Sequence, residues 1–115
     1  MKKDVEIIVT GGRDYEDYIM LEDVLDLFDI KLIVQGGAPG ADALADRYAE
    51  ESAIKSETVI ADWVKHGRAA GPIRNREMLE KYPNAIVVAF PGGAGTANCV
   101  KQAVSMNRVV LMVHK

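Results

Sequence analysis

The sequence predicts an α/β protein: a Rossmann-like three-layer sandwich in which helices cover both faces of a five-stranded, mainly parallel sheet. Three observations lead to this prediction. Short apolar or β-branched runs alternate along the chain with longer segments of helical periodicity. The runs are continuously apolar, which is typical of buried parallel strands. The ten glycines lie between these segments, where glycine permits tight turns and the close approach of a ligand.

The five expected strands are short runs that contain Val, Ile or Leu and lack internal glycine. Glycine-rich turns follow the first, second and fourth of them, so each of these strands leads through a turn into a helix. Parallel strands connected in this way imply right-handed crossovers. The expected strands are Val5–Thr10, 32–35, 58–61, 85–90 and 109–114.

Four segments between the strands have the periodicity of amphipathic helices. In the second of them, Ala41, Leu44, Ala45 and Tyr48 recur at the spacing of one apolar stripe. The third begins near Pro72, because proline suits the first turn of a helix. The expected helices are 18–28, 41–49, 72–82 and 96–106.

Length and composition indicate one globular domain over residues 1–115. The chain is 49% hydrophobic and 27% charged, which excludes a disordered or collagen-like protein. The longest apolar run, 85–90, is far shorter than the roughly 18 residues of a membrane span. No signal peptide is readable, and Cys99 has no second cysteine with which to form an internal disulfide. We therefore expect a cytoplasmic protein that does not enter a membrane.

The net charge of −3 conceals an uneven distribution along the chain. Residues 1–64 contain 6 Lys and Arg against 15 Asp and Glu, whereas residues 65–115 contain 8 against 2. An anion-binding face is therefore compatible with an acidic protein. We expect that face in the second half of the chain.

The glycine-rich turns are the first candidates for a binding site. The carboxyl ends of parallel strands meet at one edge of the sheet, and ligands bind there where the strand order reverses. Each turn also opens a helix, so backbone N–H groups and the positive end of the helix dipole are available to a phosphate group. An alternative interpretation is that the glycines only form tight turns. Asp14 and Asp42, the two acidic residues of these turns, could cap helices or contact a ligand. The candidates in these turns are Gly11, Gly12, Arg13, Asp14, Gly36, Gly37, Gly40, Asp42, Gly92, Gly93, Gly95 and Thr96.

The segment 62–76 is a second source of candidates, because it is basic and leads into the third helix. A guanidinium group can donate two parallel hydrogen bonds to phosphate oxygens. Arg74 and Arg76 are therefore expected to clamp the phosphate, with Asn75 between them. Trp63 is expected to stack on a base. The alternative interpretation is that Trp63 fills the edge of the core.

Other classes of chemistry lack a signature. The chain contains neither GxxxxGK[ST] nor GxGxxG, so ATP hydrolysis and ordinary dinucleotide binding are disfavoured and no cofactor is expected. His66 has no partner at metal-ligand spacing, so we expect no metal site. Cys99 is expected to be a small buried helix residue, because no basic residue adjoins it.

The motifs GGRDY, GGAPGADALA, ADW…GRAAGPIRNREML and FPGGAGTAN closely resemble the YspA-type, cpYpsA-related branch of the SLOG superfamily. The resemblance covers nearly the whole chain. It implies a Rossmann-like fold and the binding of nucleotides or nucleotide-derived small molecules. Many small members of this family are phage or mobile-element proteins, and relatives commonly pair through helices beside the sheet. A homodimer or higher homo-oligomer is therefore among the expectations.

Two further groups of relatives are similar in part. Lonely-guy phosphoribohydrolases share the PGGxGT turn, here 91–96, and an upstream Arg followed four residues later by Met, here Arg74 and Met78. In those enzymes paired glutamates follow the turn, whereas Asn98 and Cys99 stand here. DNA-processing A proteins share the Pro-x-Arg-Asn-Arg stretch, here 72–76, and bind single-stranded DNA through this fold.

The expected function is thus the binding of a nucleotide or nucleotide-derived phosphorylated small molecule at the carboxyl edge of the sheet. The catalytic residues, if there are any, are not identified by the sequence. A first alternative is an N-glycosidase of nucleoside monophosphates that uses Asp14, Asp42 or Asp62 in place of the missing glutamates. A second alternative is a single-stranded DNA-binding module, although nucleic acid is not the expected partner of a chain without a surplus of Lys and Arg.

Overall fold

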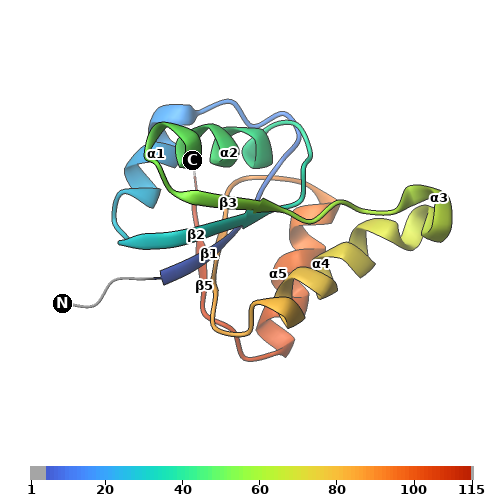
Figure 1. Ribbon diagram of the computed structural model, residues 1–115. Coiled ribbons are helices and arrows are strands. Elements are labelled where there is room, and N and C mark those ends of the chain that lie inside the picture. Colours follow the sequence, from blue (N-terminus) through green and yellow to red (C-terminus); the bar gives the residue numbers. More distant parts are fainter. Residues whose placement is uncertain (1–4, 115) are drawn as a thin grey trace.

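The computed structural model describes residues 5–114 and confirms the α/β, Rossmann-like fold. Five strands form one sheet in the order β3-β2-β1-β4-β5, and every neighbouring pair is parallel (Figure 1). The chain passes outward from β1 to β3 and then crosses back to β4, so the strand order reverses between β1 and β4. The strands are β1 Val5–Thr10, β2 Ile30–Gln35, β3 Lys55–Thr58, β4 Ile86–Ala89 and β5 Val110–Met112.

Helices cover both faces of this sheet. Figure 1 shows α1 and α2 on one side and α4 and α5 on the other, with the short α3 beyond the first turn of α4. The helices are α1 Tyr18–Leu25, α2 Ala41–Glu51, α3 Trp63–His66, α4 Ala70–Lys81 and α5 Ala94–Ser105, and a 3-10 turn η1 spans Gly67–Ala69.

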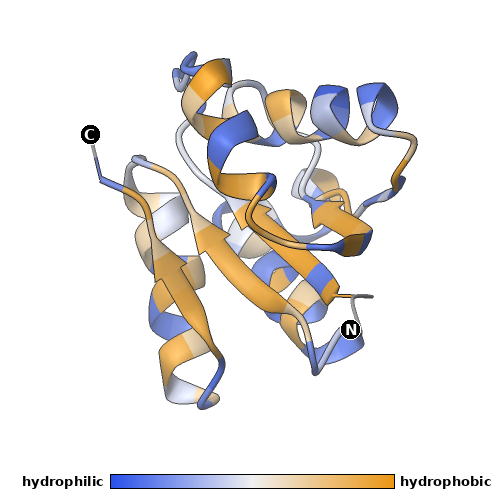
Figure 2. Ribbon diagram, turned by 90° about the vertical axis from the view of Figure 1, so that its left-hand side faces the viewer, coloured by the Kyte–Doolittle hydropathy of each residue, from blue (hydrophilic) through white to orange (hydrophobic). Residues whose placement is uncertain are grey.

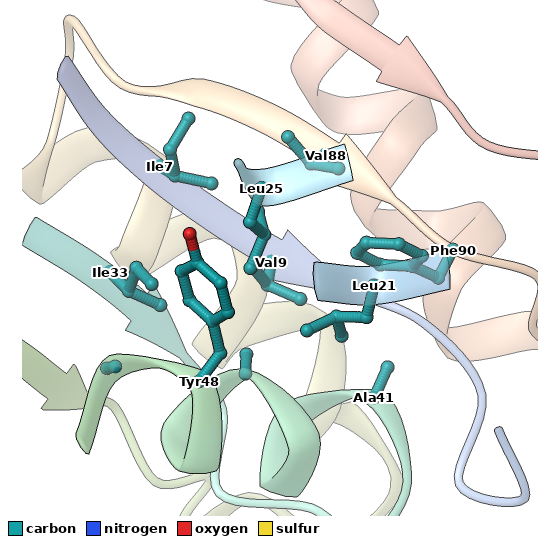
Figure 3. Close-up of a cluster of buried hydrophobic side chains, with 11 residues drawn as sticks. Ile7, Val9, Leu21, Leu25, Ile33, Ala41, Tyr48, Val88 and Phe90 are labelled. Atoms are coloured by element: carbon teal, nitrogen blue, oxygen red, sulfur yellow. The ribbon is translucent and has the colours of Figure 1, made fainter. Parts of the chain in front are cut away.

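Two apolar cores lie between the sheet and its helices, because side chains along each strand alternate between the faces. Ile7 and Val9 of β1 point toward α1 and α2, where they pack with Leu21, Tyr48 and Phe90 (Figure 3). Figure 2 shows hydrophobic residues along the strands and polar residues on the outer sides of the helices. On the opposite face, α4 and α5 pack on the sheet through a second cluster that comprises Ile8, Leu32, Val34, Met78, Leu79, Tyr82, Ala85, Val87 and Ala103.

The third strand does not lie where the sequence predicts it. The predicted range 58–61 overlaps the observed Lys55–Thr58 at one residue only. β3 is an edge strand, and its position follows from backbone pairing with β2, in which Leu32 lies opposite Lys55 and Gln35 opposite Thr58. The apolar run that follows leaves the sheet, and Ile60 is 74% exposed. An edge strand such as β3 can consist of polar residues, because its position depends on backbone hydrogen bonds to β2 more than on the burial of its side chains.

The segment between β3 and α4 also contains more helix than the sequence indicates. Asp62 begins α3 by accepting a hydrogen bond from the backbone N–H of Lys65 at 3.0 Å. α4 begins at Ala70, so that Pro72 lies in its first turn. Proline is tolerated there, because the N–H groups of the first turn have no acceptor within the helix.

Arg108 holds the carboxyl end of α4 and the turn into β4. Its Nη1 donates to the carbonyl of Leu79 at 2.7 Å, and its Nη2 donates to the carbonyls of Tyr82 and Ala85, the latter at 3.0 Å. The carbonyls of Leu79 and Tyr82 lie at the end of α4, where a helix has no N–H groups left to satisfy them. One side chain therefore donates to three carbonyls between the end of α4 and the start of β4, of which that of Tyr82 also accepts from the N–H of Ala85.

We expect Arg108→Ala to lower the free energy of unfolding by about 1–3 kcal/mol, the usual effect of leaving half-buried polar groups without a partner. Arg76→Ala serves as the control, because Arg76 forms an exposed pair with Glu80 one turn away. The control should lose about 0.5 kcal/mol or less. Urea unfolding of both variants measures the difference, and equal losses would contradict this role of Arg108.

Candidate functional site

A cavity of about 640 Å³ lies at the carboxyl edge of the sheet, where the strand order reverses. Turns that follow β1, β2, β3 and β4 all contribute to its lining, together with the beginning of α4. The turns after β1 and β4 are joined directly, since the N–H of Gly12 donates to the carbonyl of Pro91 at 2.9 Å. The position agrees with the rule for ligand sites in open parallel sheets.

Most of the residues proposed from the sequence lie together in this cavity. The structure also adds Thr10 and Tyr15, which flank the first glycine turn, and Met78 from α4. Thr10 is the last residue of β1, so its place could have been inferred from the end of the strand alone. The proposed residues that line the cavity are Gly11, Gly12, Arg13, Asp14, Gly36, Asp42, Trp63, Arg74, Asn75, Gly92, Gly93, Gly95 and Thr96.

Three proposed residues lie outside the cavity lining: Gly37, Gly40 and Arg76. Arg76 is 70% exposed at its side chain, and its Nε donates to Glu80 at 3.0 Å. The sequence suggested a pair of arginines acting together, but residues two apart on a helix point in different directions. Because α4 already includes both arginines, only Arg74 faces the glycine turns.

Arg74 spans the cavity between α4 and the turn after β2. Its Nη1 donates to the carbonyl of Gly36 at 2.8 Å, and its Nε donates to Oδ1 of Asn75 at 3.0 Å. The guanidinium lies so close to Gly36 that a Cβ at that position would be 2.2 Å from Nη1. Any side chain at position 36 would therefore displace the guanidinium from its observed position.

Asn75 connects Arg74 to α5. Its Nδ2 donates to the carbonyl of Gly95 at 3.3 Å and to Oδ1 of Asn98 at 3.1 Å. The same Oδ1 accepts a second bond from Gln102 at 2.8 Å. Asn98 occupies a position of the paired glutamates in lonely-guy enzymes, but here its oxygen accepts two amide hydrogen bonds. Its observed role is to join α4 to α5.

The first turn of α5 is open toward the cavity. Gly93 is its N-cap, and within residues 5–114 this end has no side-chain capping hydrogen bond. A Cβ built on Gly93 or Gly95 would meet no atom within 4 Å, so there is free space beside the backbone. Amide groups at a helix start, together with the positive end of the helix dipole, form a suitable environment for an anion.

Asp42 is only 7% exposed, although it lines the same cavity. Its Oδ2 accepts hydrogen bonds from the N–H groups of Gly36 at 3.1 Å and Ala38 at 3.2 Å. Burial raises the pKa of Asp42, whereas the two amides and the nearby Arg74 and Arg13 act in the opposite direction. The N-cap of α2 is Gly40, so Asp42 is not the capping residue of this helix.

The structure also decides between the interpretations of Asp14 and Trp63. Asp14 does not cap α1, because Asp17 is the N-cap and accepts from the N–H of Met20 at 3.0 Å. Trp63 does not fill the core, since it is 58% exposed and lines the cavity. Asp14 and Trp63 are therefore both accessible to a ligand.

Cys99 is fully buried in α5, as the sequence predicts. Burial raises the pKa of its thiol to about 11, so little thiolate, the reactive form, is present at neutral pH. Within residues 5–114, no three His, Cys, Asp or Glu side chains gather in a way that could hold a metal ion. Over the same residues, no helix combines the length and apolar character needed to cross a bilayer.

Comparisons with known proteins agree with this architecture. The Gene 61 protein of Mycobacterium phage D29 is 36% identical, over 84% of this chain and 86% of the phage protein. The solved structure of DNA processing protein A (DprA) from Streptococcus pneumoniae superposes with a TM-score of 0.78 at 18% identity, which shows a common fold. That match covers 97% of this chain and 51% of the solved one, so this chain spans about half of its length. Residues 5–66 match the YspA, cpYpsA-related SLOG family, and with the phage relative this establishes that the chain belongs to that family.

Proposed function

We propose that this domain binds a nucleotide or a nucleotide-derived phosphorylated small molecule, with the phosphate on the first turn of α5. The observation that carries the proposal is that Arg74 and the open start of α5 line one cavity at the reversal of strand order. Membership in the SLOG family supports nucleotide-related binding in general. The placement of each ligand group is inferred from the geometry of the cavity.

The start of α5 and Arg74 would bind the phosphate in complementary ways. The backbone N–H groups of Gly93, Gly95 and Thr96 would supply hydrogen bonds and the helix dipole, while Arg74 would supply a full positive charge. The bonds to Gly36 and Asn75 use Nη1 and Nε of Arg74, which leaves Nη2 for the ligand. An arginine that is already held in place loses less conformational freedom on binding, which favours affinity.

The rest of the cavity is suited to a base and a sugar. Its volume lies within the range of about 300–1,000 Å³ that is usual for small-molecule sites. Trp63 offers an exposed ring on which a base could stack. Arg13 and Asp14 are exposed in the cavity lining, within reach of sugar hydroxyls.

Hydrolysis of the N-glycosidic bond is less well supported than binding. Of the three acids considered for it, Asp62 caps α3 and lies outside the cavity lining. The bonding oxygen of Asp42 is held by two backbone amides. Only Asp14 is an exposed carboxylate in the cavity, so a hydrolytic reaction would depend on this residue.

The proposed phosphate site predicts that Arg74 contributes to nucleotide affinity and that its matched control, Arg76, does not. Calorimetric titration with AMP, GMP, CMP and UMP should show binding of at least one nucleotide to the wild-type protein. Arg74→Ala should weaken it by about 10- to 100-fold, as the loss of a charge-assisted hydrogen bond implies. Arg76→Ala removes the same charge from the same helix outside the cavity and should change affinity by about twofold or less. If Arg74→Ala bound as tightly as the wild type, the proposed phosphate site would be wrong.

A further prediction is that a side chain at position 36 weakens binding by displacing Arg74. In Gly36→Ala the added methyl group would overlap the guanidinium of Arg74, so the arginine must leave its position and affinity should fall nearly as much as in Arg74→Ala. The double variant should be no weaker than Arg74→Ala alone, because the methyl group then has nothing to displace. Additive losses in this double-mutant cycle would show that Gly36 acts independently of Arg74.

Another prediction distinguishes binding from hydrolysis of the nucleotide. After long incubation with the nucleotide that binds, chromatography should recover the nucleotide intact and detect no free base. Release of base that is abolished in Asp14→Asn would instead establish the N-glycosidase activity.

A further inference from the structure

The three glycine turns differ in whether their backbone N–H groups are free. In the turn after β2, Asp42 accepts from Gly36 and Ala38, and the side chain of Gln35 accepts from Gly37 at 2.6 Å. Residue 39 is a proline and has no N–H. The next amide that begins α2, that of Ala41, donates to the carbonyl of Gly12 at 3.0 Å. This glycine-rich turn therefore resembles a phosphate-binding loop in composition, but four of its backbone donors, those of Gly36, Gly37, Ala38 and Ala41, are already used within the protein.

Asp42 takes the place that a phosphate oxygen would occupy in such a turn. Its Oδ2 accepts from two backbone amides in the turn before α2, those of Gly36 and Ala38. Asp42 itself lies in the first turn of α2, where a helix start favours a negative charge. The carboxylate is buried by the surrounding chain and lines the cavity. A ligand phosphate could use these amides only by displacing a covalently attached anion.

The charge of the cavity also disfavours a phosphate group near Asp42. Its charged lining residues are Arg13, Asp14, Asp42 and Arg74, so the side chains contribute a net charge of zero when both acids are ionised. A single phosphate is compensated locally by Arg74 and the start of α5. A second phosphate that extended toward the turn after β2 would meet amides that are already bonded and, when Asp42 is ionised, its buried carboxylate. Repulsion between like charges is strong in such poorly solvated surroundings.

We propose that Asp42 is a specificity-determining residue that limits the cavity to ligands with one phosphoryl group. The domain would accordingly select a nucleoside monophosphate or a similar sugar monophosphate over the corresponding di- and triphosphates. This inference rests on the proposed function, because it assumes that the first phosphate lies on α5.

The test begins with the wild-type protein. The nucleoside monophosphate among AMP, GMP, CMP and UMP that binds most tightly is compared with its own di- and triphosphate, by calorimetry in the absence of divalent cations. We expect the di- and triphosphate to bind at least tenfold more weakly. Equal or tighter binding of the diphosphate would overturn the inference and leave the proposed phosphate site intact. Failure of all these nucleotides to bind would overturn the proposed function itself.

Two matched variants then assign the selectivity to Asp42. Asp42→Asn keeps an oxygen that can accept from the two amides but removes the charge, so the preference for the monophosphate should shrink by about tenfold. Asp46→Asn changes the net charge by the same amount on the same helix, but Asp46 is exposed, bonds to Ser56 and lies outside the cavity lining. It should leave the preference unchanged.

An unchanged preference in Asp42→Asn, or an equal reduction in both variants, would overturn the role of Asp42. Thermal unfolding of each variant checks that the fold is retained. If Asp42→Asn does not fold, Asp42→Ser supplies a neutral acceptor at the same place, and the wild-type comparison by itself still decides whether a second phosphate is rejected.

Discussion

The backbone of Gly12 is the joint between the three glycine turns, because both its N–H and its carbonyl form hydrogen bonds to other turns. Its N–H donates to Pro91 in the turn after β4, and its carbonyl accepts from Ala41 at the start of α2. All three glycine turns therefore meet at one residue beside the reversal of strand order. Gly40 lies outside the cavity but belongs to this joint, because a Cβ there would be 2.1 Å from the Gly12 carbonyl and its φ is +78°. Gly12 and Gly40 thus allow the turns to pack closely against one another, whereas Gly93 and Gly95 leave space beside α5.

The two faces of the sheet contribute differently to this site. On the α1 and α2 side, Asp17 caps α1, the first amide of α2 donates to the carbonyl of Gly12, and Asp42 accepts from two amides of the turn before α2. On the other side, α5 begins without a side-chain cap, and Asn75 holds it against α4. Arg74 extends from α4 across to the opposite turn. Arg74 and the start of α5 therefore contribute positive charge and a helix dipole from the α4 and α5 side of the cavity.

Particular residues show where sequence patterns suffice and where they do not. The central strands are apolar on both faces, so the sequence predicts β1 and the other buried segments close to their observed positions. The prediction for β3 is wrong because an edge strand is selected by backbone pairing, and its polar residues have no apolar signature. The interpretation of the sequence pairs Arg76 with Arg74 although the expected helix 72–82 contains both, and residues two apart on a helix point in different directions. Inside α4, the side chain of Arg76 points away from Arg74 and pairs with Glu80.

The fold class, the family resemblance and the set of turns at the carboxyl edge of the sheet can all be predicted from the sequence. They follow from local patterns of apolar periodicity and glycine that do not depend on distant contacts. Which turn has free donors is visible only in the folded chain, because a phosphate-binding loop and a loop filled by its own carboxylate have the same composition. The difference lies in where the Asp42 side chain points and in which amides it accepts from. Hydrogen bonds between distant segments, such as Arg74 to Gly36 and Gly12 to Pro91, determine the shape and charge of the cavity, and they exist only once the chain has folded.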